Sequence, residues 1–317
     1  MPDRSSSSTE CASRPVRVLK FGGTSVGSAD GITNAVRLVH AATETCRPVV
    51  VVSAAAGVTD ALVQAAEESR ADRGSVEAWT RRVGRHYRAL AANTLADEAL
   101  RARYDTALRA ELSELRRALQ EMAGPNAAAA RDVVLAAGER LMVPLLAAAL
   151  DASGCTSQAV DAATLIRTDA AHGDATVQWA PTRRQVRDWH RTRAAGLPVV
   201  TGFVGETADG KTTTLGRGGS DLSAAVLAWA LAAERMERWT DVEGLYTRDP
   251  DAHSDAQPLQ RIDFEQARAW TKAGRLGMHP CTLDPLMDAG IPLRVRCTHR
   301  PAAPGTRIVP APTLAQG

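Results

Sequence analysis

The sequence predicts an α/β fold built on a parallel sheet, because one pattern occurs three times along the chain. Val16 to Phe21, Val49 to Ser53 and Leu197 to Gly205 are apolar strand-like segments that run into glycine or other small residues. Helical segments follow the first two, which is the arrangement of βαβ units. Ligands of such sheets bind beyond the carboxyl ends of the strands, so the first two turns are candidates for one site.

The composition is that of a soluble globular chain. Its 317 residues, 44% hydrophobic and 23% charged, suffice for one large or two smaller domains. The net charge of +2, from 38 basic minus 36 acidic side chains, gives no electrostatic case for nucleic acid or a membrane surface as partner. The longest apolar run, Leu141 to Leu150, is too short to span a bilayer.

Cysteines and the N-terminal residues carry no functional signal. The five cysteines lie far apart, and none forms a C-x-x-C pair or accompanies a histidine cluster. They therefore indicate neither a disulfide framework nor a zinc site, and we predict no metal ligands. Residues 1–14 are Ser-rich and lack the apolar centre of a signal peptide, so we expect a disordered tail on a cytoplasmic protein.

The other elements follow from periodicity. We expect a helix from about Ala29 to Ala42 and a mostly helical region from Glu67 to Met122, with leucines at helical spacing from Leu108 to Leu119. A further helix, Asp132 to Leu150, should be interrupted near Pro144. Towards the C-terminus we expect helices at 183–193, 263–272 and 280–289, an apolar strand that ends at 240–241, and a strand at 292–297.

The most informative stretch is the loop from Thr212 to Asp221, T-T-T-L-G-R-G-G-S-D. An apolar helix should follow from Leu222 to Ala233, with Ser220 or Asp221 as its N-cap. Bare amides in a glycine-rich turn and the positive end of a helix dipole favour an anion such as phosphate, and Arg217 adds a planar two-pronged donor. The loop matches neither G-x-x-x-x-G-K-[ST] nor G-x-G-x-x-G, and a flexible loop before a surface helix is the alternative.

Taken in order, these segments resemble the catalytic domain of the aspartate kinases, in the amino acid kinase family. The resemblance covers about Val16 to Ile308 and rests mainly on K-F-G-G-T-S from Lys20 and the loop from Thr212. The other matching segments are Val52 to Thr59, Gly138-Glu139, Gly202 to Gly205, Trp239 to Val242, Tyr246, Asp249-Pro250 and His279-Pro280.

The resemblance implies a three-layer αβα sandwich on a mostly parallel sheet, as a single domain over residues 15–310. Residues 15–200 would bind the acceptor and residues 201–310 the nucleotide. The implied reaction transfers the γ-phosphoryl group of ATP, with Mg²⁺, to the β-carboxylate of L-aspartate. The implied product is 4-phospho-L-aspartate, and a homodimer is compatible with the resemblance.

The resemblance also assigns roles to residues. Lys20, with the amides of Gly22 and Gly23, would neutralise the transferring phosphoryl group. Asp221 would organise Lys20 and the amino group or the metal, and Arg217 would bind the α-carboxylate. The other acceptor-side residues are Ser53, Thr59, Glu139, Phe203 and Ser220, and the residues that would hold the adenosine are Thr240, Asp241 and Tyr246.

Two departures from the family pattern concern the nucleotide. The family has a basic residue after the Asp-Pro pair and a lysine three residues before the His-Pro pair, where this chain has Asp251 and Leu276. Two charges that contact phosphates are therefore missing from these positions. Arg248 and Arg275 lie close in sequence and are the expected substitutes.

A third departure concerns regulation and leaves other functions open. The family usually continues into paired ACT domains, whereas this chain stops at Gly317, so we expect no lysine or threonine feedback through such domains. A kinase for another amino acid or small carboxylic acid and a catalytically silent regulatory homologue are the alternatives. The missing charges favour the silent homologue, and the retention of Lys20, Arg217 and Asp221 favours the enzyme.

Overall fold

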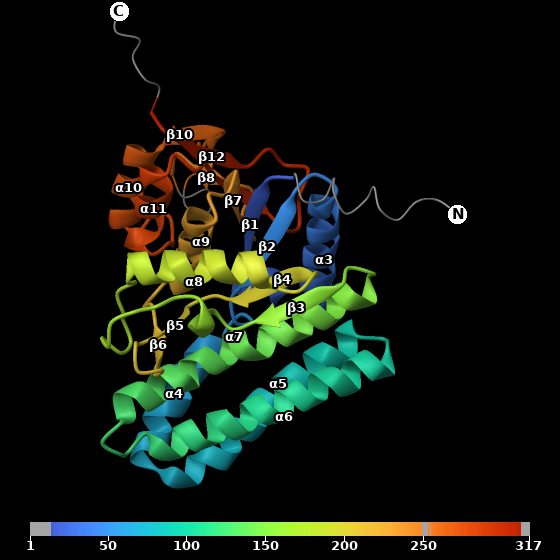
Figure 1. The fold of residues 1–317 in the computed structure, drawn as a ribbon, viewed down its shortest axis with the longest axis vertical. Helices are drawn as coiled ribbons and strands as arrows, with labels where there is room; N and C mark the ends of the chain where they lie inside the picture. The colour runs from blue at the N-terminus through green and yellow to red at the C-terminus, as the bar shows by residue number, and fades with distance from the viewer. Residues whose placement is uncertain (1–13, 249–252, 254, 312–317) are drawn as a thin grey trace, which may run out of the picture.

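The computed structural model describes residues 14–248, 253 and 255–311, with one large sheet at the centre (Figure 1). Among these residues the sheet has eight strands, in the order β10-β12-β11-β7-β1-β2-β4-β3, and every neighbouring pair is parallel except β11 and β12. This confirms the predicted parallel sheet. The strands are β1 (Val16–Phe21), β2 (Arg47–Val52), β3 (Ser157–Val160), β4 (Leu197–Thr201), β7 (Arg235–Thr240), β10 (Arg261–Asp263), β11 (Leu293–Cys297) and β12 (Thr306–Val309).

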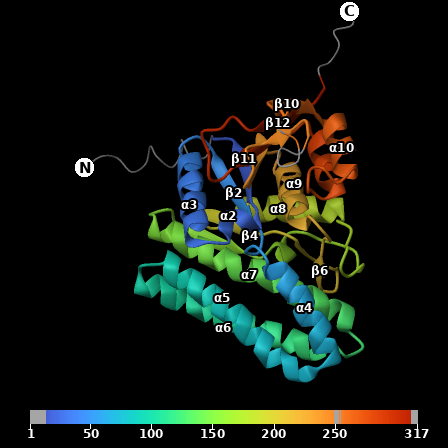
Figure 2. The same cartoon turned by 180° about the vertical axis from the view of Figure 1, so that it is seen from behind.

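Helices cover both faces of the sheet, which confirms the αβα sandwich (Figures 1 and 2). One face carries α3 (Ala29–Thr43), α4 (Val58–Ala71) and α7 (Ala127–Ala152), with α5 (Val76–Thr94) and α6 (Glu98–Glu121) packed outside them. The other face carries α8 (Trp179–Thr192), α9 (Gly219–Ala230), α10 (Phe264–Lys272) and α11 (Leu283–Asp288). Short elements complete the described chain: α2 (Gly23–Val26), η1 (Arg73–Ser75), η2 (Ala162–Thr164), η3 (Pro280–Thr282), the hairpin β5 (Val204–Glu206) and β6 (Thr212–Thr214), and the pair β8 (Leu245–Tyr246) and β9 (Pro258–Leu259).

Strand alternation divides the core between the two faces. On β1, Leu19 and Phe21 pack with the α3–α7 side, whereas Val18 packs with the α9 side. Side chains two residues apart share a face, so Lys20 is also on the α9 side. The same alternation on β7 places Arg238 with Met236 on that side. Two long basic side chains thus lie next to each other beneath α9.

The apolar helix α7 runs unbroken through Pro144, so the predicted interruption is wrong. By length and composition α7 could cross a membrane, because it has 26 residues and an 18-residue window of mean hydropathy 1.8. In the fold, however, 83% of that window is buried, so α7 packs as a core helix. Because tertiary packing surrounds α7, it outweighs the one hydrogen bond that Pro144 cannot donate.

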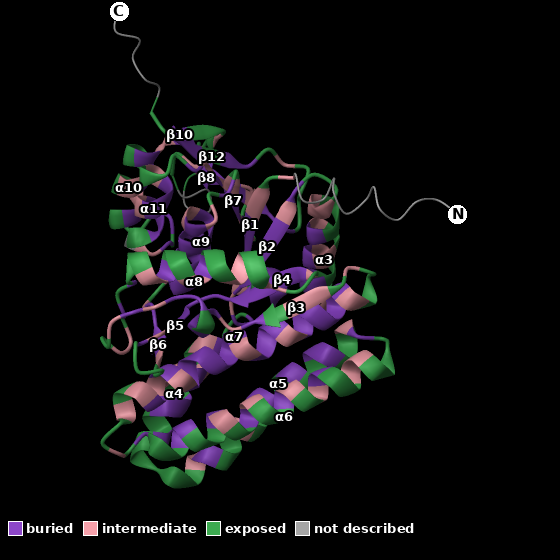
Figure 3. Ribbon diagram, viewed as in Figure 1, coloured by how far each residue is buried: buried purple, intermediate pink, exposed green. Residues whose placement is uncertain are grey.

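Burial follows the predicted helical faces (Figure 3). Leu108, Leu112, Leu115 and Leu119 are all buried on α6, as their spacing predicts. The helix expected at 183–193 begins four residues earlier, at Trp179, and the β5–β6 hairpin was not foreseen. The division into substrate and nucleotide halves at residue 200 stays a prediction.

Candidate active site

The centre of the site is a buried carboxylate held between two cations. Lys20 and Arg238 are register partners on the adjacent parallel strands β1 and β7. Asp221, in the first turn of α9, forms an ion pair with each of them. Lys20 Nζ is 2.8 Å from Oδ1, and Arg238 Nε donates to Oδ2 at 3.2 Å. The Lys20 and Asp221 side chains are 7% and 3% exposed. Three elements therefore meet at one charged cluster.

Burial and charge act against each other in this cluster. Burial alone would raise the pKa of Asp221, but the charges of Arg238 and Lys20 outweigh it and hold that pKa below its ordinary value. Burial lowers the pKa of Lys20, and Asp221 opposes that shift. The carboxylate is thus ionised, and it fixes the positions of both cations at the carboxyl ends of β1 and β7.

The helix after the glycine loop starts earlier than predicted, and its cap is different. Gly218, with φ 78°, is the N-cap of α9, so neither Ser220 nor Asp221 caps it. Those two side chains instead bond to groups within the site. A Cβ at Gly218 would lie 2.5 Å from the backbone nitrogen of His279, so this position needs glycine for its conformation and for the close approach.

The loop that carries Arg217 is anchored by a buried network. Asp132 on α7 is fully buried, accepts from Thr214 Oγ1 at 2.5 Å, and lies 2.7 Å from His172 Nδ1. These bonds hold the end of β6, two residues before Gly216. Arg217 itself is exposed, and none of the described residues forms an ion pair or hydrogen bond with its guanidinium. A fixed backbone therefore presents an uncommitted cation.

Glu139 projects from α7 into the core beside this loop. It is 2% exposed, and burial raises the pKa of its carboxyl to about 7. Ser220 Oγ donates to Oε1 at 3.5 Å, while Oε2 has no hydrogen-bond partner among the described residues. Tyr87, buried on α5, donates to the Gly138 carbonyl at 2.7 Å and so fixes this turn of α7. An unpaired buried carboxylate oxygen calls for a ligand that carries donors.

The first two strand turns meet as expected. A Cβ at Gly23 would lie 2.7 Å from the Ala54 carbonyl, so the turn after β1 touches the turn after β2. The amide of Gly22, however, donates to the Trp239 carbonyl at 3.1 Å. Of the two predicted phosphate-binding amides, Gly22 is therefore already engaged, and only that of Gly23, the first residue of α2, has no backbone acceptor within the described chain.

Two residues predicted to bind the acceptor, Ser53 and Thr59, lie on either side of the turn between β2 and α4. Ser53 directly follows β2, and Thr59 lies in the first turn of α4; both are half-buried. A Cβ at Gly138 would be 2.6 Å from the Ala54 side chain, which brings the turn of α7 that bears Glu139 against this segment. The structure thus gathers the three predicted acceptor-side residues Ser53, Thr59 and Glu139.

Phe203 takes a backbone conformation that is rare for an aromatic residue. Its φ is 69°, it is buried, and its amide donates to Ser223 Oγ on α9 at 2.9 Å. A Cβ on Gly219 would lie 2.9 Å from the Phe203 ring. Such strain persists where surrounding contacts enforce it, and it is frequent at ligand sites. Phe203 therefore packs against the start of α9, as a wall of the predicted acceptor site would.

The residues predicted to hold adenosine lie at the end of β7 and on β8, which follows it. Thr240 Oγ1 donates to Asp241 Oδ1 at 2.9 Å, and Asp241 is exposed. Tyr246, on β8, is half-buried and pairs with Pro258 on β9. Thr240 is the last residue of the strand that carries Arg238, and Asp241 and Tyr246 follow it, so the predicted nucleotide side adjoins the cation cluster.

Neither of the predicted substitute arginines contacts the cluster. Arg248 pairs with Asp255 at 3.2 Å, and Arg275 lies over the Trp270 ring at 4.1 Å and donates to the Thr247 carbonyl. Leu276 is buried and apolar. Asp251, the other departure, lies outside the described residues.

Sequence reasoning missed two residues of the site, Arg238 and Tyr87. The hydroxyl contact of Tyr87 with α7 spans 51 residues of sequence and depends on tertiary structure. Arg238 had a signal: it precedes Trp239-Thr240-Asp241 by one position in a strand that we read as apolar. A buried strand tolerates an arginine only where a partner neutralises it.

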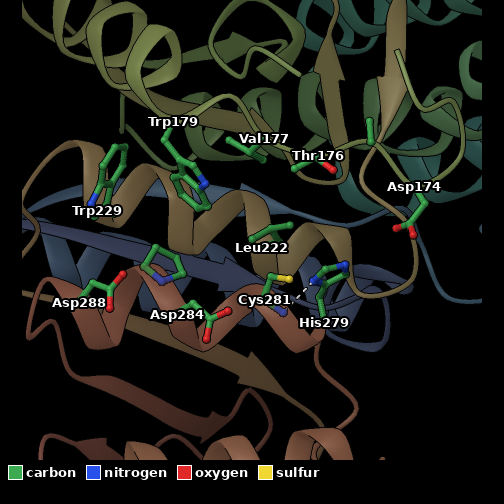
Figure 4. A pocket seen from close by; sticks show the side chains of 12 residues that line it. Asp174, Thr176, Val177, Trp179, Leu222, Trp229, His279, Cys281, Asp284 and Asp288 are labelled. Atoms are coloured by element: carbon green, nitrogen blue, oxygen red, sulfur yellow. Dashed lines mark hydrogen bonds between the residues drawn. The ribbon is translucent and has the colours of Figure 1, made fainter. Parts of the chain in front are cut away.

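A large cavity is lined by none of the site residues predicted from the sequence (Figure 4). Its volume is about 610 Å³, and it lies between α9, α11 and the segment 174–179. The ring of Trp179 packs edge-on against Trp229 at 5.2 Å, and His279 closes the end near Asp174. The predicted site is instead formed by the strand ends and the glycine loop.

The αβα fold and the charged cluster of Lys20, Asp221 and Arg238 are accompanied by a match to one protein family. A family model described as the amino acid kinase family matches residues 15–297, and the chain belongs to that family.

Within the family, the chain is similar to particular enzymes. It is 32% identical over 300 residues to chloroplastic aspartokinase 3 of Arabidopsis thaliana and 33% identical over 298 residues to lysine-sensitive aspartokinase 3 of Escherichia coli. Both matches cover 92% of this chain but only 52% and 63% of the relatives, so the chain spans between half and two thirds of their length. The crystal structure of E. coli aspartokinase III in complex with aspartate and ADP matches with a TM-score of 0.84 at 31% identity, over 94% of this chain and 65% of that one.

Proposed function

We propose that the chain is an ATP-dependent kinase that phosphorylates the β-carboxylate of L-aspartate. The observation that carries this proposal is the buried Glu139, which contacts Ser220 at the end of the glycine loop and whose Oε2 has no partner within the described chain. The same loop bears the exposed guanidinium of Arg217. An acceptor with both an α-ammonium and an α-carboxylate would satisfy both groups. A simple dicarboxylic acid would leave Glu139 unpaired, which is costly in a buried site.

The chemistry suits these side chains. A free aspartate carboxylate has a pKa of about 3.9, so the nucleophile is ionised at neutral pH and needs no general base. One of its oxygens forms a bond to the γ-phosphorus as the bond to the leaving oxygen breaks, and ADP departs with that electron pair. The protein has to bring an anion to a polyanion in line, which requires positioning and positive charge. Lys20 would supply charge at the transferring group.

ATP and Mg²⁺ enter as one substrate. The described residues contain no cluster of three or more His, Cys, Asp or Glu side chains able to hold a metal ion. Mg²⁺ commonly binds through substrate phosphates and water with only one or two carboxylates, so the absence of such a cluster fits delivery as MgATP. Thr240, Asp241 and Tyr246 are the proposed adenosine contacts, by their place at and after the end of β7.

The proposal is tested with a panel of acceptors. Purified protein is mixed with MgATP and hydroxylamine, which traps acyl phosphates as hydroxamates, and ADP release is followed with L-aspartate, L-glutamate, N-acetyl-L-glutamate and succinate. Hydroxamate and ADP with L-aspartate alone support the proposal. Turnover with N-acetyl-L-glutamate or succinate instead would overturn the ammonium-binding role of Glu139, and no turnover with any acid would favour a silent homologue.

A further inference from the structure

The missing positive charges of the nucleotide side have a candidate replacement in the structure. The sequence lacks a lysine at Leu276, and the two nearby arginines are engaged elsewhere: Arg248 by Asp255 and Arg275 by Trp270 and the Thr247 carbonyl. Leu276 itself is buried in the core beneath α9 and contributes no charge. A polyanion bound here would need a cation from another element.

Arg238 reaches the position where that lysine is missing. Its Nη1 donates to the carbonyl of Leu276 at 3.4 Å, and its Nη2 donates to the carbonyl of Gly277 at 3.2 Å. Its Nε donates to Asp221, which also binds Lys20. The guanidinium therefore lies between the phosphoryl-handling cluster and the backbone of the segment that departs from the family.

We propose that Arg238 binds the phosphates of the nucleotide in place of the absent lysine. A guanidinium has five N–H donors, of which three are used by Asp221 and the two carbonyls. One N–H donor on each terminal nitrogen remains, and both are available to phosphate oxygens. The side chain is 14% exposed, so it is held firmly and still reaches solvent.

The charge balance agrees with this role. Asp221 carries one negative charge between two cations, so the trio of Lys20, Asp221 and Arg238 has a net charge of +1. Without Arg238, the buried pair of Lys20 and Asp221 would be neutral towards a polyanion. The inference rests on the proposed kinase function for its chemistry, but nucleotide binding tests it without any acceptor.

The experiment measures the Kd of a non-hydrolysable MgATP analogue by calorimetry. Arg238→Leu should weaken binding by about 10- to 100-fold, because charge-assisted bonds to phosphate are lost. Arg238→Lys, which keeps the charge but not the fork, should fall in between. Arg294→Leu is the matched control: Arg294 lies on the neighbouring strand β11, donates to the Pro304 carbonyl, and should leave the Kd unchanged.

A second variant tests whether Arg238 binds phosphate or only clamps the backbone of Leu276 and Gly277 in place. The double variant Arg238→Leu, Leu276→Lys returns the cation to the family position, so it should recover most of the lost affinity, whereas a clamp would not be restored. Where the double variant does not fold, guanidinium at low, non-denaturing concentration should restore binding to Arg238→Ala. A folded Arg238→Leu protein with unchanged Kd, or failure of both rescues, overturns the inference. Wild-type protein that binds the analogue but shows no turnover with aspartate would instead be a failure of the proposed acceptor.

Discussion

Lys20 and Arg238, neighbours on adjacent parallel strands, bind opposite oxygens of the single carboxylate of Asp221. This arrangement places two cations side by side at the carboxyl edge of the sheet, where ligands of α/β folds collect. It also links α9, β1 and β7 in one charged cluster. Changes to the cluster should therefore affect phosphoryl transfer more strongly than they affect the fold.

Lys20→Met should abolish phosphoryl transfer while the protein stays folded. The loss of the cation at the transferring group should lower kcat by at least about 10³-fold. Breaking a buried pair commonly costs about 3–5 kcal/mol, but Arg238 still pairs with Asp221, so we expect a loss of roughly 1–3 kcal/mol. Steady-state kinetics and chemical denaturation measure the two effects, with the exposed Lys272→Met as control. A near-normal kcat would refute the assigned role.

Arg217→Lys should act on the acceptor alone. A lysine keeps the charge but cannot form the two parallel hydrogen bonds that a guanidinium gives to a carboxylate. We expect the KM for aspartate to rise by about 10- to 100-fold, with the KM for MgATP almost unchanged. Lys211→Ala, a nearby exposed change, is the control. An increase confined to the KM for MgATP would assign Arg217 to the nucleotide instead.

Glu139 should make aspartate binding depend on pH. Its carboxyl has a pKa of about 7, and only the ionised form can pair with an ammonium group. The KM for aspartate should therefore fall about tenfold from pH 6 to pH 8, and Glu139→Gln should abolish this dependence. Glu111, whose pKa burial also raises to about 7, lies outside the site and provides the control. The same profile lost in Glu111→Gln but kept in Glu139→Gln would contradict the assignment.

The Glu139 carboxyl should also make the stability of the protein depend on pH. Stability should decrease as pH rises, whereas aspartate binding should improve. Folded Glu139 holds its proton where the unfolded chain has lost it, so the native state binds more protons between the ordinary value of 4.5 and about 7. Stability of the ligand-free protein should therefore decline as pH rises through this range, by roughly 2–3 kcal/mol for this group. Denaturation of wild type and Glu139→Gln across pH 4.5 to 7.5 isolates the contribution; parallel curves would disprove it.

Gly218→Ala should disrupt the start of α9. The substitution forces a side chain into a left-handed conformation and within 2.5 Å of the His279 backbone, so both stability and activity should drop sharply. Gly210→Ala is the matched control, because Gly210 has φ 81° but open space around it. That control should lose only about 1–2 kcal/mol. Equal losses in thermal denaturation would show that the close approach to His279 is unimportant.

Sequence alone predicted the elements whose signal is local. The continuous apolar strands at β1 and β2 and the leucine spacing of α6 depend on neighbouring residues, and the structure confirms them. Pro144 was misjudged because its local cost is outweighed by packing around α7. The cap of α9 was misplaced because Ser220 and Asp221 are used by tertiary partners, which no local rule reveals.

The candidate site was predictable where it repeats a motif and not where it departs from one. Lys20, Asp221 and Glu139 followed from the resemblance, and the structure brings them together. Arg238 lies outside those motifs, and its contacts with Asp221 and Gly277 span 17 and 39 residues of sequence. Only the register of β1 with β7 places it beside Lys20.

The most direct test of the proposed kinase activity is the identity of the product. The hydroxamate formed from L-aspartate, MgATP and hydroxylamine is isolated, and the position of its new bond is determined by mass spectrometry and NMR. We expect the β-hydroxamate of aspartate, with one ADP formed per hydroxamate and none formed by Lys20→Met. An α-hydroxamate, or ADP formed without any hydroxamate, would contradict the claim that this site phosphorylates the β-carboxylate of L-aspartate.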